Sequence, residues 1–152
     1  MRLSQDLRKI FENTKLVLHP DDYTIISVDP IETHQVRKVL PSFSPFSSVT
    51  FDSAEISLVV KSDEWREVKE SFKSHCEEGP YRLITFDIVL DLSIVGFLAV
   101  VSEVLAQEGV SIYALSTYLR DHILVKREES KRAVNVLKIL VERASTRQDP
   151  KK

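Results

Sequence analysis

The fold is decided by residues 110–126, VSIYALSTYLRDHILVK. In the first half of this stretch Ile112, Ala114 and Ser116 would point to one face of a strand, because side chains alternate along a strand. A turn at Leu119-Arg120 then leads into a second alternating run that begins at His122. The stretch therefore predicts two antiparallel strands joined by a short turn.

Helices are predicted on both sides of this strand pair. Residues 93–108 carry apolar side chains at helical spacing after Ser93, a residue type that favours the start of a helix, and Gly109 is a typical helix stop. That helix is apolar on more than one face, which indicates that it packs against two partners. With a strand at 81–90 and a last helix at 129–141, the order is strand, helix, strand, strand, helix, as in a ferredoxin-like unit that lacks its final strand.

The first half of the chain predicts a similar order. A strand at 23–29, a short helix near 31–40 bounded by prolines, strands at 47–52 and 55–61 and a helix from Ser62 are expected. A helix at 3–13, a strand at 15–19 and a turn at 19–22 precede them. The strand at 15–19 has no partner in the first half, so we hypothesise that it supplies the strand missing from the second.

An internal echo supports two related halves. Thr50-Phe51 before a turn and Glu55 after it mirror Thr117-Tyr118 and Asp121, and each half continues with a Leu-Val pair. The polar segment that ends at Gly79-Pro80 is the predicted boundary. The sequence thus predicts an α+β fold made of two ferredoxin-like βαββα units in tandem, with an N-terminal extension at 1–14, units at 15–79 and 80–143, and a flexible tail at 144–152.

Composition and charge exclude several classes of function. The formal net charge of -2 with mixed charges argues against nucleic acid or an anionic membrane as partner. The apolar runs fall short of the roughly eighteen residues that a membrane-spanning helix needs, and no secretory signal is recognisable. The single cysteine, Cys76, cannot form an internal disulfide and fits a reducing compartment, so a cytoplasmic location is expected.

No catalytic or metal-binding constellation is present in the sequence. Cys76 lies beside two glutamates, which disfavour its reactive thiolate. The four histidines are widely spaced, and His75-Cys76 is an isolated pair without the spacing of a metal site. No phosphate-binding glycine loop is found. The protein is therefore predicted not to be an enzyme and to need no cofactor or metal.

Three segments resemble the ACT-domain family: LSIVG at 92–96, EGVSI at 108–112, and LSTY at 115–118 with DHILVK at 121–126. Within that family the chain is most similar to small tandem ACT proteins and to the CASTOR cytosolic arginine sensors. The resemblance implies a ferredoxin-like fold, side-by-side packing of ACT units, and amino-acid binding at the interface between units. Because this chain holds one tandem, a comparable interface would require a homodimer.

The resemblance also implies a set of ligand-binding residues. By motif match, the loop that opens the first helix, the start of the next strand and the turn after it would contact the ligand; these positions are Gly96, Ser111, Ile112, Thr117, Tyr118 and Asp121. Each has a structural alternative: Asp121 as a turn residue that bonds backbone N–H groups, Gly96 as a site of close helix packing, and Tyr118 as a packing residue. Arg120 beside Asp121 argues against a cationic ligand.

The leading hypothesis is a non-catalytic regulatory or sensor protein that binds a free amino acid or similar metabolite through ACT-ACT interfaces, with a protein partner in nutrient signalling. Two alternatives remain open. One is a structural or protein-interaction module that has lost the ligand. The other is a regulatory subunit of an amino-acid biosynthetic enzyme such as an amino-acid kinase.

Overall fold

A computed structural model describes residues 3–146, and it divides the chain into two compact units. Unit 1 combines Met1–His19 with Leu83–Lys152, whereas unit 2 is the continuous segment Pro20–Arg82. Two long strands, β1 (Lys15–Val28) and β4 (Cys76–Asp87), each contribute one part to each unit. These boundaries differ from those of the units predicted at 15–79 and 80–143. Each observed boundary falls inside a long strand, β1 or β4, that continues from one unit into the other.

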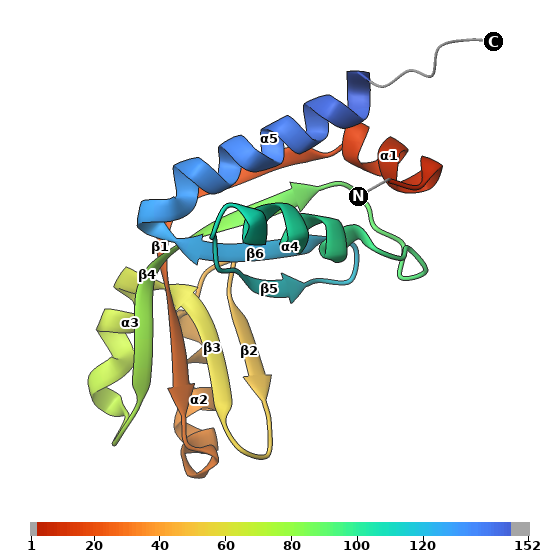
Figure 1. Cartoon of the computed structure of the whole chain (residues 1–152). Helices are drawn as coiled ribbons and strands as arrows, with labels where there is room; N and C mark the ends of the chain where they lie inside the picture. Colours follow the sequence, from red (N-terminus) through yellow and green to blue (C-terminus); the bar gives the residue numbers. More distant parts are fainter. Residues whose placement is uncertain (1–2, 147–152) are drawn as a thin grey trace, which may run out of the picture. The chain divides into compact units, whose positions relative to one another are not determined.

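Unit 2 is an antiparallel sheet with short helices (Figure 1). Its strand order is β2-β3-β1-β4, and β3 pairs antiparallel with both of its neighbours. Between β1 and β4 the chain forms η1 (Pro30–Glu32), α2 (Thr33–Val39), η2 (Leu40–Ser42), β2 (Ser48–Phe51), β3 (Ile56–Lys61), α3 (Ser62–Val68) and η3 (Lys69–Ser71). The helices bury one apolar side against the sheet, where Trp65 is the largest fully buried side chain of the core.

Unit 1 has the strand order β1-β4-β6-β5. Its other elements are α1 (Gln5–Glu12), α4 (Phe97–Gln107), β5 (Tyr113–Ser116), β6 (Asp121–Lys126), η4 (Arg127–Glu129) and α5 (Ser130–Thr146). Residues 15–19 belong to this unit, where the sequence suggested that a strand was missing. Helices α1, α4 and α5 share one apolar core with alternate residues of the strands, such as Ile84, Phe86 and Ile123.

The predicted turn at 19–22 is wrong, because β1 continues through it as one strand. Pro20 favours extended backbone at the residue before it, which suits a strand as well as a turn. Farther along, Asp21 Oδ2 lies 3.6 Å from Lys61 Nζ, and Tyr23 is the register partner of Lys61. Pairing between strands therefore prevails over the local turn chemistry of Pro-Asp-Asp.

The segment between β4 and α4 also differs from the prediction. Strand β4 begins at Cys76 rather than 81 and ends at Asp87, and α4 begins at Phe97 rather than near 93. Ser93 is not a helix cap, because its N–H donates to Asp91 Oδ1 at 2.9 Å within a turn. The predicted strand end and helix start are instead one loop, residues 88–96, and Val95 of the expected helix is exposed.

The sequence echo between the halves does not match the register of the two hairpins. Phe51 pairs with Ile56 at the end of one hairpin, and Ser116 pairs with Asp121 at the end of the other. The structural equivalent of Asp121 is therefore Ile56 rather than Glu55. The structural equivalent of Thr117 is Asp52 rather than Thr50, because each donates the N–H that closes its turn. The echo is thus shifted by two residues on one strand and by one on the other, so it cannot transfer site residues between the units.

The last helix is longer than the sequence predicts. Helix α5 runs to Thr146, and Ala144 is buried in the core of unit 1 although it was assigned to the flexible tail. The rest of that predicted tail, 147–152, lies outside the described residues. Among residues 3–146, the search for a helix long and apolar enough to cross a membrane found none.

Candidate functional site

Two loops of unit 1 form the walls of the candidate site. The first is the loop 88–96, whose shape is set by Asp91: its carboxylate accepts the Ser93 N–H at 2.9 Å and its carbonyl accepts the Ile94 N–H at 2.9 Å. Hydrogen bonds from Ser93 lower the pKa of the Asp91 carboxyl, so the carboxylate form is favoured. The second loop is the β5–β6 turn at 117–120, closed by the Thr117 N–H to the Arg120 carbonyl at 2.9 Å.

The two loops are tied to each other. The Leu90 N–H donates to the Leu119 carbonyl at 2.8 Å, which links the middle of one loop to the turn. Arg120 Nε donates to Asp87 Oδ1 at 2.9 Å, which fixes the turn to the end of β4. Both contacts lie at the ends of paired strands, so the sheet holds the loops at a defined spacing.

A pocket of about 160 Å³ lies between the loops and the start of α4. This volume is below the ~300 Å³ at which pockets for drug-sized ligands begin, so it suits a small metabolite. Its walls combine apolar and charged side chains: Leu90, Asp91, Leu92, Ile94, Phe97, Ser116, Thr117, Tyr118, Arg120 and Asp121.

The charges around the pocket have both signs. Asp91 and Asp121 provide two carboxylates, and Asp121 Oδ1 accepts the Ser116 hydroxyl at 2.6 Å. The one hydrogen bond described for the Arg120 side chain uses Nε and goes to Asp87, not to Asp121. In this geometry the charge of Arg120 is therefore directed to Asp87 rather than to Asp121. The pocket thus offers two carboxylates that can pair with a ligand's ammonium group and one guanidinium that can pair with a ligand's carboxylate.

A chain of hydrogen bonds connects the turn to the sheet beneath it. Thr117 Oγ1 lies 3.2 Å from His122 Nε2, His122 Nδ1 lies 2.9 Å from Thr85 Oγ1, and Thr85 Oγ1 lies 2.7 Å from His19 Nε2. Burial lowers the pKa of His122, and the nearby His19 lowers it further. Neutral imidazole is thus favoured at the position that supports Thr117.

The structure brings three of the six predicted site residues into this pocket. Thr117, Tyr118 and Asp121, which belong to the end of β5, the turn and the start of β6, line it. Tyr118 is 77% exposed, so its ring stands at the mouth and is not part of the core.

The other three predicted residues lie outside the pocket lining. Gly96 precedes α4 with a φ of 93°, and a Cβ atom there would lie 3.3 Å from Leu7 Cδ1. Ser111 is exposed on the connection between α4 and β5, and Ile112 is half-buried against the core of unit 1. Gly96 and Ile112 thus have packing roles in the structure, and Ser111 is open to solvent.

Sequence reasoning missed several lining residues, mainly from the loop 88–96. That loop was interpreted as the end of a strand and the start of a helix, which hid Asp91 and the apolar residues Leu90, Leu92 and Ile94. A signal was available: Asp91 two residues before Ser93 is the pattern of an aspartate-capped turn. For the buried Phe97, by contrast, helical spacing alone cannot distinguish a pocket wall from a core residue.

No group of histidine, cysteine, aspartate or glutamate side chains that could hold a metal ion occurs among residues 3–146. The chemistry that the described site offers is therefore ionic and hydrogen-bonding recognition next to an apolar wall.

Comparison with known proteins supports an ACT-type fold. Residues 78–138 match the family model described as ACT domain, and this segment contains both loops of the site. No curated protein sequence matches the chain. The family model therefore matches less than half of the chain.

Solved structures extend the likeness to most of the chain. A Vibrio cholerae protein of unknown function has a TM-score of 0.70 at 20% identity, over 90% of this chain and 97% of its own. The regulatory subunit of aspartate kinase from Thermus flavus has a TM-score of 0.67 at 14% identity, over 82% and 95%. The allosteric aspartate kinase of Clostridium acetobutylicum matches at 0.65 and 15%, over 84% of this chain and 34% of the enzyme. At these identities the likeness shows the fold.

Proposed function

We propose that this protein is a non-catalytic regulatory protein of two ACT-like units that binds a free amino acid or a similar small zwitterion in the pocket of unit 1. The observation that carries the proposal is the pocket itself, in which charges of both signs surround an apolar wall. In this arrangement Asp91 and Asp121 hold the ammonium group, Arg120 holds the carboxylate, and Phe97 contacts the side chain of the ligand.

The mouth of the pocket supports an interface with a second copy. Leu92 and Tyr118 line the pocket and are 78% and 77% exposed, and Val95 in the same loop as Leu92 is 85% exposed. Large apolar side chains gathered around a binding site are typical of surfaces that a partner covers. A ligand enclosed there would stabilise the dimer, and the dimer would bind the ligand more tightly.

The test is a thermal-shift screen against each of the standard amino acids, combined with light scattering. A ligand present at about 100 times its dissociation constant adds about 2.7 kcal/mol, a shift of several degrees for a chain of this size. Asp121→Asn keeps the shape and removes the charge, so the shift should disappear. Asp52→Asn in the equivalent hairpin turn of unit 2, where Asp52 accepts the Ala54 N–H at 3.2 Å, is the matched control and should keep the shift.

A second candidate is a ligand-free protein-interaction module, which the same exposed apolar residues favour. It predicts a stable dimer that no amino acid shifts. The resemblance in fold to a regulatory subunit of aspartate kinase favours a further variant of the proposal, in which the partner is a biosynthetic enzyme. Co-purification of such an enzyme with the tagged chain distinguishes this variant from a sensor that acts alone.

A further inference from the structure

One side chain, Phe97, belongs both to the pocket and to the packing of the N-terminal helix α1. Phe97 lines the pocket at the start of α4. The ring of this residue stacks on Phe11 of α1, with centroids 4.7 Å apart and planes 11° apart. Phe86 of β4 meets it edge-on at 5.3 Å and 85°. Phe97 is therefore held from two sides and forms the wall of the pocket on a third.

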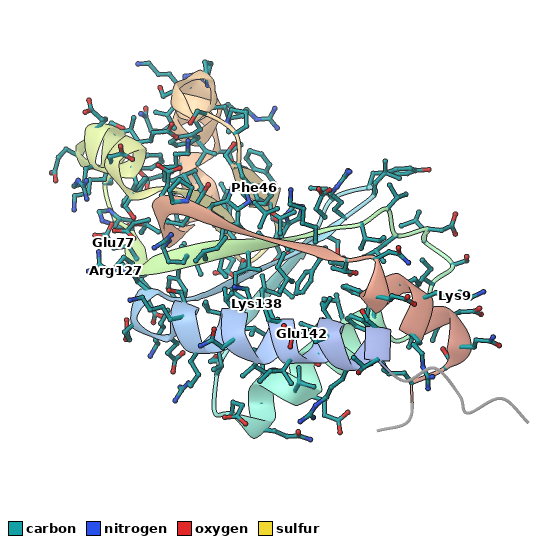
Figure 2. The ribbon with its side chains drawn as sticks, turned by 90° about the horizontal axis from the view of Figure 1, so that it is seen from above. Lys9, Phe46, Glu77, Arg127, Lys138 and Glu142 are labelled. Atoms are coloured by element: carbon teal, nitrogen blue, oxygen red, sulfur yellow. The ribbon has the colours of Figure 1, made fainter. Side chains whose placement is uncertain are left out.

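A second contact connects α1 to the start of α4. The Leu7 side chain lies against Gly96, the residue directly before Phe97, so closely that a Cβ atom there would be 3.3 Å from Leu7 Cδ1. Leu3, Leu7 and Ile10 pack against the core of unit 1. Helix α1, marked by Lys9 in Figure 2, also packs beside α5, marked by Glu142.

Helix α1 depends on this docking for its structure. It spans only eight residues, Gln5–Glu12, with Ser4 as its cap. Isolated helices shorter than about 12 residues are marginal in water. We therefore expect α1 to be helical only while its apolar face, above all the buried Phe11, packs against α4 and α5.

We propose that the docking of α1 and the occupancy of the pocket are coupled through Phe97, so that α1 is the element by which unit 1 transmits ligand binding. Because the interior is densely packed, the Phe97 ring cannot shift toward or away from the pocket without changing its stack on Phe11. A ligand that holds the ring in place stabilises docked α1, and docked α1 by reciprocity raises ligand affinity. That the pocket binds an amino acid rests on the proposed function, whereas the coupling between the pocket and α1 does not.

The coupling is tested first without any ligand, by hydrogen exchange of the full chain. In Phe11→Ala the amides of the loop 88–96 and of the turn 117–120 should exchange at least roughly tenfold faster than in wild type. Phe72→Ala is the matched control, because it removes the same side chain from a buried position in unit 2. There the ring centroid of Phe72 lies 5.4 Å from that of Trp65. Variants are compared at denaturant concentrations that give equal global stability.

The outcome that overturns the coupling is equal exchange of these pocket amides in the two variants. If Phe11→Ala does not fold, Phe11→Leu takes its place, because it keeps apolar volume and loses the flat ring stack. The reverse direction uses Phe97→Leu, in which the amides of α1 should exchange faster than in Phe72→Ala at equal stability. Unchanged exchange in α1 would also contradict the proposal.

The ligand arm uses whichever standard amino acid gives the largest thermal shift. With that amino acid bound, the amides of α1 should exchange more slowly together with those of the pocket. If the ligand slows exchange of the pocket amides but not of the α1 amides, the coupling is contradicted and the proposed function still stands. If no standard amino acid binds, the proposed function is contradicted. The comparison of the variants without ligand still tests the coupling in that case.

Discussion

Gly96 shows how one residue can serve two structural demands at the entrance to α4. Its φ of 93° lies in the region where side chains clash with the backbone, and the neighbouring Leu7 leaves little room for a Cβ atom. The functional reading, in which glycine lets the backbone approach a ligand, is not needed to explain it. The packing of α1 and the turn into α4 are sufficient reasons for glycine here.

A pair of glycine substitutions separates these two demands. Gly109→Ala, at a φ of 67° with open space around the new methyl group, should cost about 1–2 kcal/mol of unfolding free energy from strain alone. Gly96→Ala should cost more, roughly 2–3 kcal/mol, because the methyl group also displaces Leu7. Urea denaturation measures both values.

A double-mutant cycle checks the cause of the difference. In a Leu7→Ala background the penalty of Gly96→Ala should fall toward that of Gly109→Ala, since the displaced side chain is then absent. Equal penalties for Gly96→Ala in both backgrounds would mean that backbone strain, and not Leu7, sets the cost.

His122 makes a prediction about pH at the same scale. Its pKa is lowered in the folded chain, while an unfolded chain titrates near the ordinary value of about 6.5. Between the two values the unfolded state binds more protons, so stability is full above the ordinary pKa and decreases as pH falls toward the folded one. His122→Gln should make this decrease shallower in denaturation curves recorded across that range.

The control for this prediction is His34→Gln on the exposed side of α2. It should leave the acid-side slope as in wild type. If both variants keep that slope, the hydrogen-bonded chain from Thr117 through His122 to Thr85 does not govern the acid sensitivity of the fold.

At the scale of elements, the two hairpins and the helices were predictable from sequence because each carries a local pattern of apolar residues. Strand β5 alternates between half-buried and exposed side chains, but the alternation predicted for β6 is wrong, because four consecutive residues from His122 to Val125 are buried. Helix α5 repeats its apolar residues at helical spacing up to Ala144, beyond the predicted end. The loop 88–96 was not predictable in the same way. Leu90, Ile94 and Phe97 are apolar at spacings that suit a strand or helix, and only the hydrogen bonds of Asp91 reveal a turn.

The candidate site reflects this difference. The part contributed by the hairpin turn, including Thr117 and Asp121, followed from its motif, whereas the part contributed by the loop 88–96 did not. Arg120 was noticed in the sequence, but its contact with Asp87 depends on strands β4 and β6 being neighbours. Such contacts between distant residues follow from sheet order, which local patterns do not specify.

At the scale of the whole molecule, unit 1 predicts a specific failure of a fragment. Residues 80–152, cut at the boundary suggested by the sequence, lack the segment 15–19 that lies beside β4 and the Phe11 ring that stacks on Phe97. An exposed sheet edge and an uncovered core should leave this fragment largely unfolded. Circular dichroism and amide NMR dispersion measure the outcome.

Restoring the missing segment is the control. A chain in which residues 3–19 follow residue 146 through a flexible glycine-serine linker should fold, since it contains every described element of unit 1. A stable, dispersed spectrum from 80–152 alone would show instead that the N-terminal segment is dispensable.

The shared strand β1 also bears on the order in which the chain is synthesised. The continuous unit 2 is complete in sequence once Arg82 has been made, but unit 1 must wait for its C-terminal part. Until then the apolar face of α1, with Leu7 and Phe11, has no core to join. The segment 3–19 is thus made before unit 2 and is buried only after the C-terminal part of unit 1 has been made. During that interval its exposed apolar side chains are the part of the nascent chain most prone to aggregate.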